Sequence, residues 1–366
     1  MTIPLYTQKE LQTISESFTK ELADARDGHS NSLAYLQNPL TPSSILSESD
    51  VVQVMSIGGT LCKTAYTSHG HGETLEFTDY DITSIPLFDT KEHFLSYITK
   101  HIKKDATILA LNFAYPMTPI LRKEHTDGIL LRATKEHTFK GLVGETVGEE
   151  IENAVKKEYG RQIQVITAND TVCLALSGLE VSSWDKVVGG IVGTGTNMGF
   201  FADEHTIINL ESGNFDKLKQ TESGRYVDQI STNPGKHLFE KEVSGAYLYQ
   251  HYNYYLELLD PTLPKLQSTL EMSDITDKQI DLYSLVTQLI SRSASLFATQ
   301  IAGMINHLKK DHVSFIMEGS VFWDIPLYTQ YLHEHIKELS INPSVFSFHH
   351  IKNSNLQGTA RLVYRG

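Results

Sequence analysis

The chain has 366 residues and a mass of 41.1 kDa, which is enough for about two domains. Its composition is that of a globular protein, and its net charge of −13 argues against a surface for nucleic acid or anionic membranes. The only two cysteines, Cys62 and Cys173, form neither a CxxC metal pair nor a disulfide framework. We find no apolar run long enough for a membrane helix and no signal peptide, so we expect a reduced, cytoplasmic protein.

The first part of the chain is predicted to alternate between helices and strands. Thr7 and Glu10 fit a capping box that begins an amphipathic helix. Residues 28–50 contain two prolines and several serines, so we expect a loop there. The further expected elements are strands at 51–59, 64–66, 75–79, 107–116 and 163–167, a turn at Gly70 and Gly72, and helices at 91–103 and 147–159.

The second part of the chain repeats this organisation. Residues 187–201 are predicted to form a strand, a glycine-rich turn and a second strand, which is a faint repeat of residues 51–66. Helices are expected at 282–307, 327–339 and 358–364, and strands at 312–320 and 345–351. A strand, a helix and a strand in this order predict parallel pairing through a right-handed crossover.

Two glycine-rich turns are the first candidates for a binding site. Gly58-Gly59-Thr60 lacks the spacing of a Walker loop, and Gly193-Thr194-Gly195 leads into a strand where a dinucleotide fingerprint needs a helix. Glycine lets the backbone approach a ligand closely, so that successive N–H groups can bind one anion. One interpretation is a pair of turns that binds a polyphosphate, and the other is two tight hairpins without a ligand.

Several motifs, taken in order, resemble those of the hexokinase family. They are Leu111–Lys135 with Phe-x-x-Pro and Leu-x-x-Thr-Lys, Thr167–Val172 with Asn-Asp-Thr-Val, Gly190–Phe200, Asn209–Gly213, Asn233–Gly245, Arg292–Ala294 and Glu318–Ser320. The resemblance implies an α/β fold with two actin-like (ribonuclease H-like) domains around an interdomain cleft. The implied small domain is 51–168 plus 356–366, and the implied large domain is 1–50 plus 169–355.

The same resemblance implies roles for individual residues. Asp170 would accept the proton of a sugar hydroxyl, and Lys135 would place positive charge near the reacting oxygen. The implied sugar-binding residues are Thr134, Lys135, Asn169, Asp170, Asn197, Glu211 and Glu240. The implied phosphate- and nucleotide-binding residues are Gly58, Gly59, Thr60, Gly193, Thr194, Gly195, Gly319, Ser320 and Gly358. The structural alternatives are an Asx-turn at Asp170, surface acids at Glu211 and Glu240, and ordinary turns at Gly319, Ser320 and Gly358.

The chain departs from the family pattern at four places. Ser56 stands where the family has the aspartate that organises magnesium, Ala114 replaces a serine in the sugar strand, and His237 replaces a glutamine. The C-terminal nucleotide loop reads Asn355–Thr359 instead of Gly-Ser-Gly-Lys-Gly. Close histidine pairs lack the spacing of a metal site, so we assign no residue as a protein ligand of a metal.

The favoured function is therefore that of a kinase using ATP and Mg²⁺ to phosphorylate the 6-hydroxyl of glucose or a similar hexose. Ser56 and the altered nucleotide loop motivate a first alternative, a sugar-binding regulator or sensor with little kinase activity. A second alternative is a kinase for N-acetylglucosamine. The expected partners are a hexose and ATP, without nucleic acid or a membrane segment.

Overall fold

The computed structural model describes residues 2–41, 47, 49–69, 75–134 and 136–364. The chain divides into two compact units. Unit 1 comprises residues 1–35, 190–198 and 210–349, and unit 2 comprises residues 36–189, 199–209 and 350–366. The two domain boundaries implied by the resemblance remain a prediction.

Unit 2 contains a five-stranded sheet in the order β4-β3-β2-β5-β8. The strands are β2 (Val52–Ile57), β3 (Leu61–His69), β4 (Leu75–Ser84), β5 (Ile108–Phe113) and β8 (Gln164–Ala168). β2, β3 and β4 pair antiparallel, whereas β2, β5 and β8 pair parallel. The carboxyl ends of three parallel strands therefore meet at one edge of this sheet.

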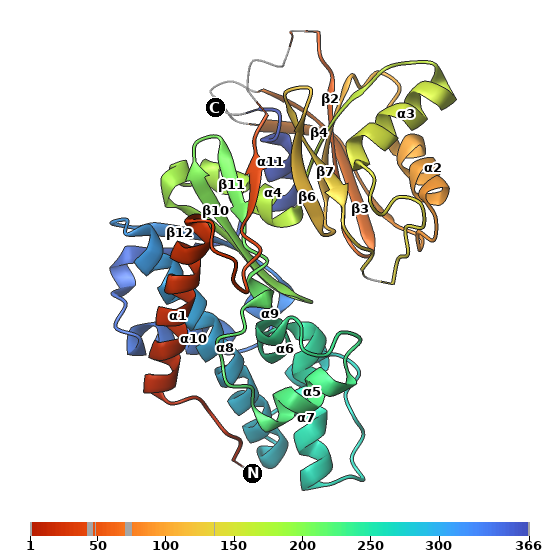
Figure 1. The fold of residues 1–366 in the computed structure, drawn as a ribbon. Coiled ribbons are helices and arrows are strands. Elements are labelled where there is room, and N and C mark those ends of the chain that lie inside the picture. Colours follow the sequence, from red (N-terminus) through yellow and green to blue (C-terminus); the bar gives the residue numbers. More distant parts are fainter. Residues whose placement is uncertain (1, 42–46, 48, 70–74, 135, 365–366) are drawn as a thin grey trace. The chain divides into compact units, whose positions relative to one another are not determined.

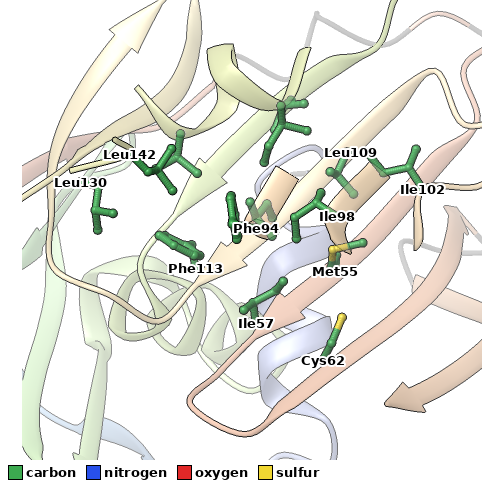
Figure 2. Close-up of a cluster of buried hydrophobic side chains, with 14 of the residues drawn as sticks. Met55, Ile57, Cys62, Phe94, Ile98, Ile102, Leu109, Phe113, Leu130 and Leu142 are labelled. Atoms are coloured by element: carbon green, nitrogen blue, oxygen red, sulfur yellow. The ribbon is translucent and has the colours of Figure 1, made fainter. Parts of the chain in front are cut away.

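One face of this sheet carries the apolar core shown in Figure 2. Met55 and Ile57 of β2 and Leu109 and Phe113 of β5 are buried against side chains of α2 (Lys91–His101), among them Phe94. α3 (Val147–Tyr159) completes the cover of this face. Side chains alternate between faces along a strand, so the even-numbered residues of β2 and β5 point to the opposite face.

Two helices cover that opposite face. α4 (Asp170–Ser177) and α11 (Ser354–Ala360) pack against each other, and both contact β5 (Figure 1). α11 contacts β2 as well. Ser56 and Asn112 lie on this face, at the carboxyl ends of their strands and beside the amino end of α4.

A second sheet has the strand order β1-β11-β10-β9-β12-β13. The strands are β1 (Leu36–Pro39), β9 (Val187–Val192), β10 (Thr196–Asp203), β11 (Thr206–Asn209), β12 (Val313–Glu318) and β13 (Phe346–His349). β12 and β13 pair parallel, which confirms the parallel pairing predicted for this part of the chain. A separate two-stranded sheet joins β6 (Met117–Arg122) to β7 (His125–Leu130).

Helices make up most of unit 1. The long helix α8 (Ile280–Leu308) packs against α1 (Gln8–Arg26) and α10 (Tyr328–Glu338) (Figure 1). The remaining α-helices are α5 (Glu222–Ile230), α6 (Leu238–Val243), α7 (Gly245–Leu259) and α9 (Ser320–Trp323). The short 3₁₀ helices described in this unit are η4 (Ser212–Asn214), η5 (Thr269–Asp274) and η6 (Pro343–Val345), whereas η2 (Gly178–Glu180) and η3 (Trp184–Lys186) belong to unit 2. Among the described residues, no helix is both long and apolar enough to cross a membrane.

Two local predictions about secondary structure were wrong, and one hairpin was not predicted. Residues 36–39, expected to be loop, form the edge strand β1, and Pro39 is tolerated there because an edge strand pairs on one side only. The β6–β7 hairpin was not predicted; it lies within Leu111–Lys135, the segment that the resemblance implies to bind sugar (the expected sugar segment). The last helix covers Ser354–Ala360 instead of residues 358–364. The predicted turn at Gly70 and Gly72 lies outside the described residues.

Candidate functional site

The amino end of α4 holds Asp170, the predicted proton acceptor. Asn169 caps the helix, and its Oδ1 accepts a hydrogen bond of 2.9 Å from the N–H of Thr171. Its Nδ2 donates to the Tyr115 carbonyl at 3.4 Å, so the buried amide has a fixed orientation. Asp170 is the first residue of α4 and is half-buried. Its Oδ1 also accepts from the Thr171 N–H, at 2.8 Å.

Oxygen atoms gather at the same edge of the five-stranded sheet. Ser56 and Asn112 are paired in the register of β2 and β5, and Asn112 is paired with Ala168, two residues before Asp170. Ser56 is 6% exposed and Asn112 is 2% exposed. Within the described part of the chain, Asn112 Oδ1 has no hydrogen-bond partner. A buried amide oxygen without a partner is costly, and an added ligand or water would satisfy it.

The first glycine turn connects β2 to β3. The N–H of Gly58 donates to the Leu61 carbonyl at 3.0 Å and closes the turn. Thr60 is exposed at its tip. Tyr115 Oη donates to the Gly58 carbonyl at 2.9 Å, and His137 Nε2 lies 3.4 Å from the Gly59 carbonyl.

The expected sugar segment lies in the same unit. Thr134 is half-buried in a stretch without regular structure, and its carbonyl accepts from the N–H of His137 at 3.2 Å. Lys135 lies outside the described residues. Ala114, where the family has a serine, follows β5 and donates its N–H to the Ile57 carbonyl at 3.0 Å.

The second glycine turn lies in unit 1 and packs against Gly319. Gly193 donates its N–H to the Gly195 carbonyl at 2.9 Å and accepts from the N–H of Gly245 at 2.7 Å. Gly319 has φ +112°, and a Cβ there would come within 2.2 Å of the Val192 carbonyl oxygen. Glycine is therefore required at 319, because a side chain would be strained and would collide with backbone. Ser320 follows as the first residue of α9, and Thr194 is exposed.

Glu240 is held against this second turn. Its Oε2 accepts a 3.0 Å hydrogen bond from the N–H of Thr196, the first residue of β10. A Cβ at Gly195 would lie 2.6 Å from the same oxygen, and one at Gly213 would lie 3.0 Å from the Glu240 Cβ. Two glycines thus make the space in which this half-buried carboxylate sits.

Asn197 and Glu211 complete this part of unit 1. Asn197 Oδ1 accepts from the N–H groups of Met198 at 2.7 Å and Ser212 at 3.1 Å. Ser212 directly follows Glu211, which has φ +49° and therefore occupies the left-handed region unfavourable for a residue with a side chain. His237, at the start of α6, has φ +53°. Strained backbone of this kind concentrates at functional sites.

Gly358 has a packing role in the structure. It lies inside α11 and is buried, and a Cβ there would come within 1.6 Å of the Cys173 carbonyl oxygen in α4. The two helices approach closely because residue 358 has no side chain. Its predicted contact with a nucleotide remains a prediction.

Sequence reasoning missed three residues of the site. Tyr115 and His137 support the first glycine turn, and Thr196 orients Glu240 through its backbone N–H. Tyr115 lies inside the Phe-x-x-Pro motif, and His137 lies two residues after the Thr-Lys motif. In the sequence, only this proximity to the motifs indicated that the two residues belong to the site.

The residues around Asp170 fit a magnesium ion that is bound mostly through phosphate and water. Their available atoms are the Asp170 carboxylate, the Ser56 hydroxyl and the Asn112 amide oxygen. Mg²⁺ prefers oxygen ligands, keeps several waters and takes one or two carboxylates from the protein. The described residues contain no group of three or more His, Cys, Asp or Glu side chains that would hold a metal without substrate.

Comparisons with known proteins agree with these features. One family model, described as hexokinase, matches residues 5–179. A second model, also described as hexokinase, matches residues 187–256 and 256–364. A hexokinase from Brugia malayi is 26% identical over 357 residues, which cover 78% of this chain and 62% of that relative. Glucokinase-1 from Saccharomyces cerevisiae is 29% identical over 293 residues, which cover 64% of this chain and 58% of that relative.

A solved structure has the same fold. The structure of a hexokinase from Schistosoma mansoni complexed with glucose matches 98% of this chain and 95% of its own, with a TM-score of 0.78 and 20% identity. This likeness confirms the predicted α/β fold of the actin-like sugar kinases. The chain itself spans only 58% to 62% of the length of the two curated relatives.

Proposed function

The chain belongs to the hexokinase family, and from this premise we propose that it is an ATP-dependent hexose kinase. It would transfer the γ-phosphoryl group of ATP to the 6-hydroxyl of glucose or a similar hexose. The observation that carries this proposal is the position of Asp170, half-buried at the amino end of α4 beside the buried oxygen atoms of Ser56 and Asn112. We also propose a cytoplasmic location and no nucleic-acid partner.

Asp170 would act as the proton acceptor. In the described part of the chain, its hydrogen bonds from Thr171 use Oδ1 and leave Oδ2 without a donor. A carboxylate oxygen at the edge of the sheet can then accept the proton of a sugar hydroxyl as that oxygen attacks phosphorus. Lys135 would add positive charge near the reacting oxygen. Asn169, fixed by Thr171 and Tyr115, would bind a neighbouring hydroxyl.

The two glycine turns would bind the phosphates. Backbone N–H groups at Gly59 and Thr60 in one turn, and at Thr194 and Gly195 in the other, are the available donors for an anion. Gly319 and Ser320 would neighbour the nucleoside, because Gly319 packs directly on Gly193. Mg²⁺ bound to the phosphates would neutralise the charge that develops during transfer.

The test of the proposed function is a coupled assay that detects ADP with glucose, fructose, mannose and N-acetylglucosamine as acceptors. We expect turnover with at least one of the three unsubstituted hexoses. Turnover confined to N-acetylglucosamine would identify the kinase of the second alternative. Sugar binding by calorimetry together with no ADP formation above the sugar-free background would identify the sensor.

The sugar-binding role of Glu240 leads to a prediction. The substitution Glu240→Gln keeps the shape of the side chain and removes its charge, and a hydrogen bond to a charged group contributes about 1.5–3 kcal/mol. We expect the hexose dissociation constant, measured by calorimetry, to rise by roughly 10- to 100-fold. The control is Glu257→Gln, an exposed acid of the same unit paired with Lys265. Equal affinities in the two variants would remove Glu240 from the sugar site.

Ser56 separates the enzyme from the sensor. A serine offers a hydroxyl but no negative charge beside the magnesium, and losing an outer partner of a metal typically costs 10- to 100-fold in affinity or activity. We therefore expect slow turnover and a low affinity for Mg²⁺. We expect Ser56→Asp to raise turnover or to lower the Mg²⁺ concentration needed for half-maximal activity. Because Ser56 is buried, the thermal stability of Ser56→Asp must be measured in parallel, with Ser56→Asn as the uncharged control. An inactive parent that Ser56→Asp does not rescue would favour the sensor.

A further inference from the structure

The backbone carbonyls of the first glycine turn are bound from inside unit 2. Tyr115 Oη donates to the Gly58 carbonyl at 2.9 Å, and His137 Nε2 lies 3.4 Å from the Gly59 carbonyl. The side chains of Tyr115 and His137 are buried, at 1% and 4% exposed, beneath a turn that is half-buried at Gly58 and Gly59. Burial raises the pKa of the Tyr115 hydroxyl, which therefore remains a donor.

The contacts of His137 determine which ring nitrogen carries the proton. The backbone N–H of Phe88 lies 2.9 Å from Nδ1, and since an N–H can only donate, Nδ1 accepts. The proton of the neutral ring is then on Nε2, which donates to the Gly59 carbonyl. Phe88 and Phe139 stack on the imidazole, each with its ring centroid 5.2 Å away, and hold its plane.

These two bonds fix the direction of two N–H groups. The described chain has no cis peptide bonds, and in a trans peptide the carbonyl and the following N–H point in opposite directions. The Gly58 and Gly59 carbonyls point inward to Tyr115 and His137, so the N–H groups of Gly59 and Thr60 point outward. Neither N–H donates a hydrogen bond to any described residue. Two adjacent outward donors form a site for an anion.

The backbone of the same two residues is bonded to the expected sugar-binding residues. The N–H of His137 donates to the Thr134 carbonyl at 3.2 Å, and the Tyr115 carbonyl accepts from Asn169 Nδ2 at 3.4 Å. Each residue that binds the turn through its side chain is thus bonded through its backbone to a residue expected to bind sugar.

We propose that Tyr115 and His137 are positioning residues that aim the N–H groups of Gly59 and Thr60 at a phosphate of the nucleotide. This inference rests on the proposed function, since it assigns the turn to a nucleoside triphosphate. The direction of the N–H groups of Gly59 and Thr60 would then depend on the side chains of Tyr115 and His137 as well as on the glycines of the turn.

The test uses two variants that keep the aromatic packing. Tyr115→Phe removes only the hydroxyl that binds the Gly58 carbonyl. His137→Phe removes the bond to Gly59 and the acceptor of the Phe88 N–H, and it retains an aromatic ring packed against Phe88 and Phe139. The matched control is Tyr364→Phe, because Tyr364 is a buried tyrosine of the same unit whose hydroxyl donates to the Thr67 carbonyl at 3.3 Å. Losing one such bond corresponds to roughly a two- to tenfold change in an equilibrium constant.

Two measurements are made on each variant of the 366-residue chain. They are the KM for Mg·ATP at saturating hexose and the dissociation constant for Mg·AMPPNP, a non-hydrolysable analogue, by calorimetry. We expect both constants to rise by roughly two- to tenfold in Tyr115→Phe and in His137→Phe. We expect parental values in Tyr364→Phe, and a hexose dissociation constant within about twofold of the parent in all three.

The calorimetric arm needs no turnover, so it separates this inference from the proposed function. A parent that binds Mg·AMPPNP without phosphorylating any hexose would refute the kinase and still allow the positioning role to be tested. Unchanged nucleotide affinity in both variants would overturn the inference, as would an equal loss in Tyr364→Phe. A parent with no affinity for Mg·AMPPNP would overturn it as well.

Discussion

Asp170→Asn is expected to lower kcat by at least about 100-fold, the usual scale for the loss of a general base. Asparagine keeps an oxygen to accept the N–H of Thr171, so the amino end of α4 should stay folded. It cannot accept the proton of the sugar hydroxyl at neutral pH, so the chemical step slows. The measurement is kcat at saturating hexose and ATP, together with hexose affinity by calorimetry.

The control for this prediction is Asp170→Ala, which removes the proton acceptor and also the oxygen bonded to Thr171. Both variants should lose turnover to a similar degree, whereas only the alanine variant should lose noticeable thermal stability. Hexose affinity should fall less than kcat in both. Turnover close to the parental value in Asp170→Asn would mean that Asp170 has a structural role and that the reaction occurs elsewhere.

Gly358→Ala is expected to have the largest effect on stability. The added Cβ would lie 1.6 Å from the Cys173 carbonyl oxygen and 2.5 Å from its carbonyl carbon, so α11 and α4 would have to separate. Overpacking a core usually costs 1–3 kcal/mol, and a collision with backbone exceeds that range, so we expect a loss on the order of 4 kcal/mol or a failure to fold. Urea unfolding of the purified variant gives this value.

Gln357→Ala provides the comparison for Gly358→Ala. Gln357 is a half-buried neighbour on the same helix, and its replacement tests whether α11 tolerates alanine in general. We expect that variant to unfold within about 1 kcal/mol of the parent. Gly358→Ala could instead prove as stable as Gln357→Ala and change only the KM for ATP. Residue 358 would then contact the nucleotide, and it would not be required for the packing of α11 against α4.

Elements with strong local signals could be predicted from the sequence. The capping box of Thr7 and Glu10 is present in α1, with both reciprocal hydrogen bonds formed. The helix expected at 147–159 coincides with α3, because its apolar residues recur at helical spacing and Gly160 ends it in a left-handed conformation. In contrast, β1 was hidden in a segment rich in proline and serine, since edge strands depend on their partner more than on their own residues.

The site was only partly predictable for a similar reason. Thr134, Asn169, Asp170, Asn197, Glu211 and Glu240 could be named from motifs, because each lies within a short stretch of chain. The hydrogen bonds from Tyr115 to Gly58 and from His137 to Gly59 join residues far apart in the sequence, so no local pattern reveals them. The glycine at 358 suggested a nucleotide loop, whereas close packing of two helices is visible only in three dimensions.

The most direct test of the proposed hexose kinase uses glucose and 6-deoxyglucose with the purified protein, ATP and Mg²⁺. The two sugars share every group except the hydroxyl that would be phosphorylated. We expect glucose 6-phosphate, seen by ³¹P NMR in amounts equal to the ADP formed, and no sugar phosphate from 6-deoxyglucose. No sugar phosphate from glucose or any other hexose, or equal phosphorylation of 6-deoxyglucose, would contradict the proposed function.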